Sequence, residues 1–245
     1  NNRIQEPEML QRKEAACTWM EGNGKSCPIH IRLFQTPNLQ KSCDDSAWLI
    51  KMSYFEECLK KGQAFADRSN IPTSFIYSGE EAVANWERYG NMFLVILSYC
   101  WLDKKHPDPH LFTLRRLVPL LKKVHAYFRE AKEDLPEFGV IIDYCSLWQN
   151  LSALWESRTP KQLGEFKVGL TCINTPYSHK DVTAIKLTCT PSEEARTYEL
   201  RGWTFFESRV IDGKGTGTIP RANNWVIYPD GFRTDPGTLN VIVVD

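Results

Sequence analysis

The stretch NMFLVILSYCW, residues 91–101, is an apolar run that ends in serine, tyrosine, cysteine and tryptophan. Such a run predicts a strand that is covered on both faces, as in a parallel sheet. A second apolar run, EFGVIID at 137–143, is followed by YCSLWQ, so polar and aromatic side chains again come directly after a strand. We call the polar and aromatic residues at the end of each strand its tip. Because parallel strands end at the same edge of a sheet, we expect the two tips to line one ligand-binding crevice.

Outward from these two runs, strands alternate with helical patterns. Leucines at helical spacing over 106–134 predict a helix that starts at Asp108 and Pro109 and is kinked or split at Pro119. Two more helices are predicted, over 159–174 beginning at Pro160 and over 192–210 beginning at Ser192. Further strands are predicted over 181–190, 223–230 and 239–245. This order predicts an α/β fold with a mainly parallel five-stranded sheet and helices on both faces.

Residues 1–90 differ from the rest in their sequence pattern, because turn-rich segments separate short helical patterns. The clearest pattern covers 44–68, where Trp48, Met52, Phe55 and Leu59 recur at helical spacing and residues 44–46 offer N-caps. We therefore expect a helical and irregular N-terminal extension over 1–90 and an α/β domain over 91–245.

The composition argues against two classes of partner. Thirty acidic residues balance 30 basic ones, whereas a nucleic-acid-binding protein normally has a basic excess. No apolar run reaches the roughly 18 residues that a membrane span needs. Eight cysteines without a C-x-x-C pair are typical of reduced core residues, which favours a cytoplasmic protein.

Two weaker motifs lie near the N-terminus. GNGKS at 22–26 resembles the end of a phosphate-binding loop, but Trp19 stands where that motif needs its first glycine, which favours a simple turn. Cys17, Cys27, His30 and Cys43 could supply four zinc ligands, although their spacing fits no compact zinc finger. We expect no metal and no resident cofactor.

The stretch YELRGWTFFESRV, residues 198–210, is the most informative motif. On a helix, Trp203 and Glu207 are four residues apart and share a face. A buried carboxyl has a raised pKa unless a cation pairs with it. Three arginines, Arg196, Arg201 and Arg209, are close in sequence. The pattern leaves two interpretations open: a structural glutamate–arginine pair at a helix edge, or a functional carboxylate.

Three segments in this order resemble the heterokaryon-incompatibility (HET) domain family. They are the tip Ser98–Trp101, the segment Ile141–Cys145 with Gln149, and Arg201–Glu207, and together they span about residues 91–211. The HET domain is itself similar to a divergent Toll/interleukin receptor (TIR) domain, in which a tryptophan stands four residues before a catalytic glutamate. The resemblance implies a flavodoxin-like sheet and an NAD glycohydrolase with Glu207 as its catalytic group.

The resemblance also implies where the substrate, NAD or NADP, would bind. The expected substrate-binding residues are the two tips and the start of the late helix: Ser98, Tyr99, Trp101, Asp143, Tyr144, Trp148, Arg201 and Trp203. The nicotinamide of NAD is already cationic and leaves as a neutral base, so one ionised carboxylate could stabilise the ribosyl cation without a general acid. This chemistry requires a cation near Glu207 that offsets the cost of burial.

Two other functions fit the same sequence. A domain of this shape could be a non-catalytic signalling module that forms homo-oligomers, or a sensor that binds a nucleotide without turnover. An open crevice that reaches Glu207 favours the enzyme or the sensor. A filled crevice with an exposed apolar patch favours the self-associating module.

Overall fold

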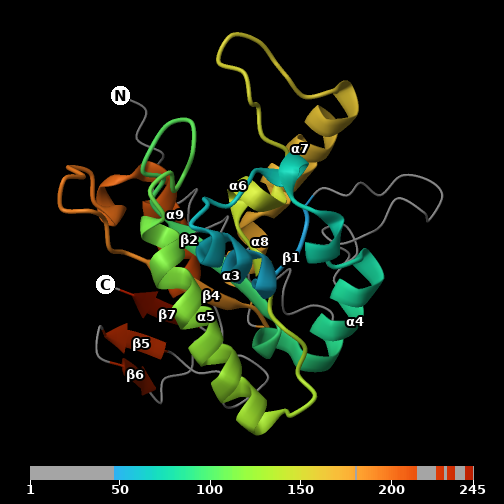
Figure 1. The fold of residues 1–245 in the computed structure, drawn as a ribbon, viewed down its shortest axis with the longest axis vertical. Helices are drawn as coiled ribbons and strands as arrows, with labels where there is room; N and C mark the ends of the chain where they lie inside the picture. The colour runs from blue at the N-terminus through green and yellow to red at the C-terminus, as the bar shows by residue number, and fades with distance from the viewer. Residues whose placement is uncertain (1–46, 180, 214–224, 229–230, 235–240, 245) are drawn as a thin grey trace, which may run out of the picture.

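The computed structural model of this protein describes residues 47–179, 181–213, 225–228, 231–234 and 241–244. Strands in these residues form one seven-stranded sheet with the order β1-β3-β2-β4-β7-β5-β6 (Figure 1). The strands are β1 Ile50–Lys51, β2 Leu94–Tyr99, β3 Gly139–Ile141, β4 Thr183–Leu187, β5 Trp225–Tyr228, β6 Gly231–Thr234 and β7 Val241–Val244. Together with the helices, this sheet confirms the predicted α/β class.

All five predicted strands are present, as β2, β3, β4, β5 and β7, but the sheet is mixed, so the prediction that it is mainly parallel is wrong. The inner strands β3, β2, β4, β7 and β5 run parallel to their neighbours, while β1 and β6 pair antiparallel at the two edges. The edge strands escaped sequence prediction because β1 has only two residues and β6, GFRT, lacks a sustained apolar pattern. The pairing partner of β1 is β3, which lies far away in the sequence.

The helices flank the sheet. They are α3 Met52–Lys61, α4 Gly79–Tyr89, α5 Phe112–Ala131, α6 Asp143–Ser146, α7 Pro160–Cys172, α8 Asn174–Ser178 and α9 Gly202–Asp212. Four single 3-10 turns accompany them: η1 Arg68–Asn70, η2 Thr73–Phe75, η3 Gly90–Met92 and η4 Tyr198–Leu200. The start of α7 is as predicted, with Pro160 in its first turn and Thr159 forming a capping box with Gln162.

The long helix α5 neither splits at Pro119 nor begins at Asp108. Pro119 lies on the exposed face of α5, where water can satisfy the carbonyl group that loses its partner, and the helix continues through it. Asp108 nevertheless caps the helix from outside, because its carboxylate accepts hydrogen bonds from Thr113 N and Leu114 N at 3.0 and 2.8 Å.

Two predicted helices are shorter than the sequence pattern suggests. The helix predicted from Ser192 starts only at Gly202, and Tyr198 precedes it in the turn η4 with its side chain buried. In the 44–68 segment the helix starts at Met52, because Ile50 and Lys51 pair with β3 as an edge strand. The predicted N-caps at 44–46 lie outside the described residues.

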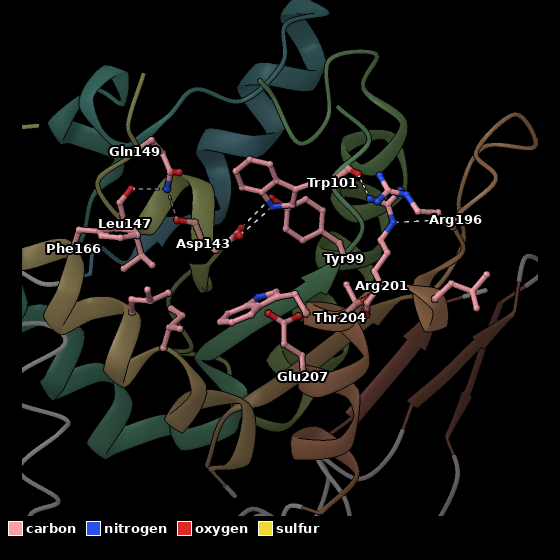
Figure 2. A pocket seen from close by; sticks show the side chains of 15 residues that line it. Tyr99, Trp101, Asp143, Leu147, Gln149, Phe166, Arg196, Arg201, Thr204 and Glu207 are labelled. Atoms are coloured by element: carbon pink, nitrogen blue, oxygen red, sulfur yellow. Dashed lines mark hydrogen bonds between the residues drawn. The ribbon is translucent and has the colours of Figure 1, made fainter. Parts of the chain in front are cut away.

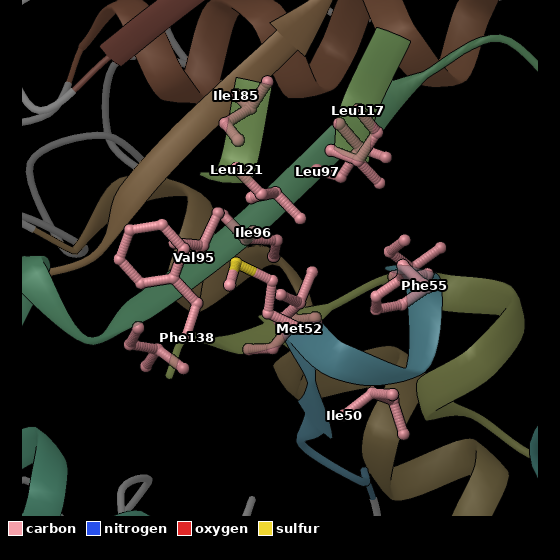
Figure 3. Close-up of a cluster of buried hydrophobic side chains, with 14 of the residues drawn as sticks. Ile50, Met52, Phe55, Val95, Ile96, Leu97, Leu117, Leu121, Phe138 and Ile185 are labelled. Atoms are coloured by element: carbon pink, nitrogen blue, oxygen red, sulfur yellow. The ribbon is translucent and has the colours of Figure 1, made fainter. Parts of the chain in front are cut away.

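Apolar side chains from both halves of the chain form one core (Figure 3). Every residue of β2 is buried, and Met52 and Phe55 of α3 join Leu117 and Leu121 of α5 in the same cluster. Within the predicted extension, residues 47–90 thus share the core of the residues that follow. On β2, Ser98 contacts α9, and strand alternation turns Leu97 to the opposite face, so helices cover both faces of the sheet.

Candidate functional site

A cavity of about 530 Å³ lies at the carboxyl edge of β2 and β3, within the size range of small-molecule sites (Figure 2). Its walls come from the ends of these strands, from α6 and α7, and from the segment that leads into α9. The lining residues are Tyr99, Trp101, Asp143, Leu147, Gln149, Phe166, Leu170, Ile173, Arg196, Leu200, Arg201, Gly202, Trp203, Thr204 and Glu207. Because Leu200 and Trp203 on its wall are exposed, the cavity opens to solvent.

Asp143 stands on the wall formed by the two strand tips. Its Oδ1 accepts hydrogen bonds from Tyr99 Oη at 3.1 Å and from the Tyr144 backbone N–H at 2.7 Å, and its Oδ2 accepts one from Trp101 Nε1 at 3.0 Å. Burial raises the pKa of Asp143, and these three donors oppose the shift by stabilising the ionised form. Residues that follow two different strands thereby fix one carboxylate at the cavity.

Glu207 stands on the α9 side of the same cavity and is only 3% exposed. Its Oε2 accepts a hydrogen bond from the hydroxyl of Ser98 on β2. Ser98 Oγ also lies 2.6 Å from the hydroxyl of Tyr198, which donates to it because the Ser98 proton is directed at Glu207. The strand and the turn η4 therefore orient the carboxyl group.

Burial raises the pKa of Glu207 to about 8, and the nearby charge of Asp143 adds to the shift. Hydrogen bonding from Ser98, Tyr177 and Trp203 acts in the opposite direction. Among the described residues, the ion pairs do not include Glu207. The described residues thus do not supply the cation expected beside this carboxylate, and the raised pKa favours the protonated form of Glu207 at neutral pH.

Arg201, directly before the first residue of α9, is engaged elsewhere. Its guanidinium group pairs with Glu194 at 3.0 Å and donates hydrogen bonds to the carbonyl oxygens of Trp101 at 2.6 Å and Arg196 at 3.2 Å. Arg201 and Glu207 therefore do not form a closed pair, which was the structural interpretation that the sequence left open. Arg201 instead joins the segment before α9 to the tip of β2.

The structure brings together seven of the nine predicted site residues. Six of them line the cavity, namely Tyr99, Trp101, Asp143, Arg201, Trp203 and Glu207, and Ser98 contacts Glu207 from behind. Trp203, at 46% exposure, presents a ring that a ligand can reach.

Tyr144 and Trp148 are not on the cavity wall, contrary to prediction. Tyr144 is buried, and its ring makes edge contacts with Phe65, Trp101 and His106 at centroid distances of 6.2, 5.5 and 5.0 Å. Trp148 packs on the guanidinium group of Arg68 at 4.3 Å. Both aromatic rings therefore serve packing, because adjacent side chains of the tip point in different directions.

Sequence reasoning missed the apolar side of the cavity and the hydroxyl behind Glu207. Phe166, Leu170 and Ile173 line the cavity from α7 and its end, and their helical spacing marked them only as one face of a helix. Tyr198 was placed inside a longer predicted helix, and no local signal marks its pairing with Ser98, which is 100 residues away.

The earlier motifs near the N-terminus, GNGKS and the cysteine–histidine set, lie outside the described residues. Within the described ranges, no group of three or more histidine, cysteine, aspartate or glutamate side chains is arranged to hold a metal ion. No helix in that part of the chain combines the length and apolar character needed to cross a bilayer.

Comparison with known proteins gives no relative: no family model, no curated protein and no solved structure matches this chain significantly. The geometry of the cavity and the resemblance of the motifs are therefore what indicates a function.

Proposed function

We propose that this chain is a HET/TIR-type domain that acts as an NAD(P) glycohydrolase, with Glu207 as its catalytic carboxylate. The observation that carries the proposal is that Glu207 lines an open cavity together with Tyr99, Trp101 and Asp143, which follow β2 and β3. The five parallel inner strands with helices on both faces support the finer proposal of a flavodoxin-like, TIR-like core. The motif resemblance is the reason to propose a role in stress, immunity or cell-death signalling.

The chemistry follows from the leaving group. When the bond between nicotinamide and ribose breaks, the bonding electrons neutralise the pyridinium ring, and positive charge develops on the ribose. An ionised Glu207 beside the anomeric carbon stabilises that charge strongly, because the site is largely shielded from water. The exposed ring of Trp203 on the cavity wall is suited to stack on the nicotinamide. Water then adds to the ribose to complete the hydrolysis.

The pH dependence of nicotinamide release tests this proposal. Only the ionised form of Glu207 can stabilise the ribosyl cation, and the pKa of this carboxyl is raised to about 8. The rate is therefore expected to rise about tenfold per pH unit below pH 8 and to level off above it. Purified protein incubated with NAD or NADP, with nicotinamide quantified by chromatography from about pH 6 to about pH 10, gives this profile. A rate that is flat or falls over this range contradicts an ionised Glu207 as the catalyst.

A self-associating signalling module is the second candidate, because apolar side chains are exposed around α9. Leu200, Trp203, Phe205 and Phe206 are 69%, 46%, 43% and 45% exposed. Such a group of large apolar residues on a surface favours contact with another protein. The open cavity and these exposed residues occur together, so catalysis and homo-oligomer formation are compatible.

Light scattering across a concentration series tests the second candidate. The wild-type chain is expected to form oligomers as its concentration rises, and replacing Phe205 and Phe206 together with serine is expected to shift association to at least about tenfold higher concentration. A substitution of Arg116, which lies over the ring of Phe112 on α5 and away from α9, is the control and is expected to leave association unchanged. A wild-type chain that stays monomeric at every concentration rejects self-association as its function.

A further inference from the structure

The cavity holds two carboxyl groups whose surroundings differ. Asp143 accepts three hydrogen bonds, from two side chains and one backbone N–H, and every one of them favours a carboxylate. Glu207 is buried and accepts a hydrogen bond from Ser98 on Oε2, and Tyr177 and Trp203 also hydrogen-bond to its carboxyl group.

Burial and the Asp143 carboxylate favour the neutral form of Glu207, while hydrogen bonds from Ser98, Tyr177 and Trp203 oppose it without a full positive charge. The groups that face Glu207 include no cation in the described residues. They come from every element packed around it: Ser98 of β2, Tyr177 of α8, Tyr198 of η4, Trp203 of α9, the Cys100 thiol and the Asp143 carboxylate. None of these groups is a cation, and Arg201, on the same cavity wall, pairs with Glu194. One cavity can thus hold a protonated acid, Glu207, beside a carboxylate, Asp143, which three donors stabilise against its own burial. Acid-assisted cleavage of a glycosidic bond requires this combination.

We propose that this cavity also cleaves N-ribosides whose base is uncharged, such as purine nucleoside monophosphates, with Glu207 as the proton donor and Asp143 as the carboxylate that stabilises the ribosyl cation. This inference uses the site of the proposed function and names a second class of substrate for it. A pyridinium base leaves without help, whereas a neutral purine is a poor leaving group until one of its nitrogen atoms is protonated. A neutral acid at the site would be idle in NAD cleavage but is needed here.

The reaction balances as a hydrolysis. The bond between the base nitrogen and C1′ of the ribose breaks, its electron pair stays on the base, and the proton of Glu207 passes to the base, which leaves neutral. Water attacks C1′ and gives up a proton to Asp143. Exchange with solvent then returns a proton to Glu207 and removes one from Asp143. The products are free base and ribose 5-phosphate, and no oxidant or metal is consumed.

The experiment incubates the full chain with AMP and, separately, with NAD, and measures free adenine and free nicotinamide from about pH 6 to about pH 10. Adenine release is expected to be constant below about pH 8 and to fall about tenfold per pH unit above it, opposite to nicotinamide release. Nicotinamide without adenine from AMP overturns this inference and leaves the proposed function standing. Adenine without nicotinamide overturns the proposed function and supports the inference, and release of neither overturns both.

Variants separate the two carboxyl groups. Asp143→Asn is expected to lower adenine release by at least about 100-fold, and Glu207→Gln, which has no proton to donate, by a similar factor. Glu130→Gln, an exposed carboxylate on α5, is the matched control and is expected to leave both activities unchanged. Adenine release that survives Asp143→Asn rejects the role of Asp143. If that variant fails to fold, the pH profiles of the wild-type chain still decide the proposal.

Discussion

Replacing Glu207 with glutamine is expected to lower nicotinamide release from NAD by about 10²–10³-fold. Glutamine keeps the size of the side chain and can still accept the hydrogen bond from Ser98, but it cannot carry the negative charge that stabilises the ribosyl cation. The comparison is best made above about pH 8, where wild-type Glu207 is ionised. Nicotinamide release that is unchanged by Glu207→Gln would reject this residue as the catalytic group.

The same variant has a second readout that does not depend on activity. Burial raises the pKa of Glu207 from its ordinary value of 4.5 to about 8, so in this pH window the folded protein holds a proton that the unfolded chain releases. The stability of the wild-type protein therefore falls as the pH rises between these two values. The stability of Glu207→Gln does not change with pH for this reason, because glutamine does not titrate. The Tm of the variant is expected to rise relative to wild type from about pH 4.5 to about pH 8. A constant difference in Tm would contradict the raised pKa.

Replacing Arg68 with leucine is expected to lower the free energy of unfolding by about 3–5 kcal/mol. The Arg68 side chain is fully buried between the rings of Trp48 and Trp148, each 4.3 Å from its guanidinium carbon. It also donates to the Ser146 carbonyl oxygen at 3.2 Å and pairs with buried Glu165 at 3.7 Å. Leucine would leave the buried Glu165 carboxylate with the exposed Lys161, at 3.6 Å, and without its buried cation, which is the costly way to break a buried pair.

Urea denaturation of the wild type and three variants measures this effect. Arg88→Leu is the matched control, because Arg88 pairs with Asp134 on the exposed surface, where an ion pair contributes at most about 1 kcal/mol. Adding Glu165→Leu to Arg68→Leu is expected to restore part of the loss, since no unpaired charge is then buried. A cost below about 1 kcal/mol for Arg68→Leu alone would show that the buried cation is not a major source of stability.

Arg68 and the side chains around it, Trp48, Trp148 and Glu165, also help to position the wall of the cavity. Trp148 lies between Leu147 and Gln149, which line the cavity, and its indole N–H donates to Glu165 of α7. The ring that sequence reasoning assigned to the ligand thus anchors the cavity wall to α7 and to residues 47–68. Loss of Arg68 is therefore expected to affect the cavity through the position of its wall.

Much of the local structure could be predicted from the sequence. The apolar runs predicted β2 and β3, the helical pattern with Pro160 at its start predicted α7, and four-residue spacing put Trp203 and Glu207 on one helix. These features depend on neighbours within a few residues, where periodicity and capping act directly. That the two strand tips would meet at one edge also followed from parallel pairing alone.

What the sequence by itself determined is which segments form strands and helices and which end of the sheet carries the polar tips. Only the tertiary structure decided the partners: Glu194 for Arg201, Tyr198 for Ser98, Arg68 for Trp148, and, within the part of the chain that the structure describes, no cation for Glu207. The physical reason is that such contacts join residues that are distant in the chain, and the local periodicity of the sequence cannot predict them. The protonation of a buried carboxyl depends on what surrounds it in space, and the folded structure alone sets that.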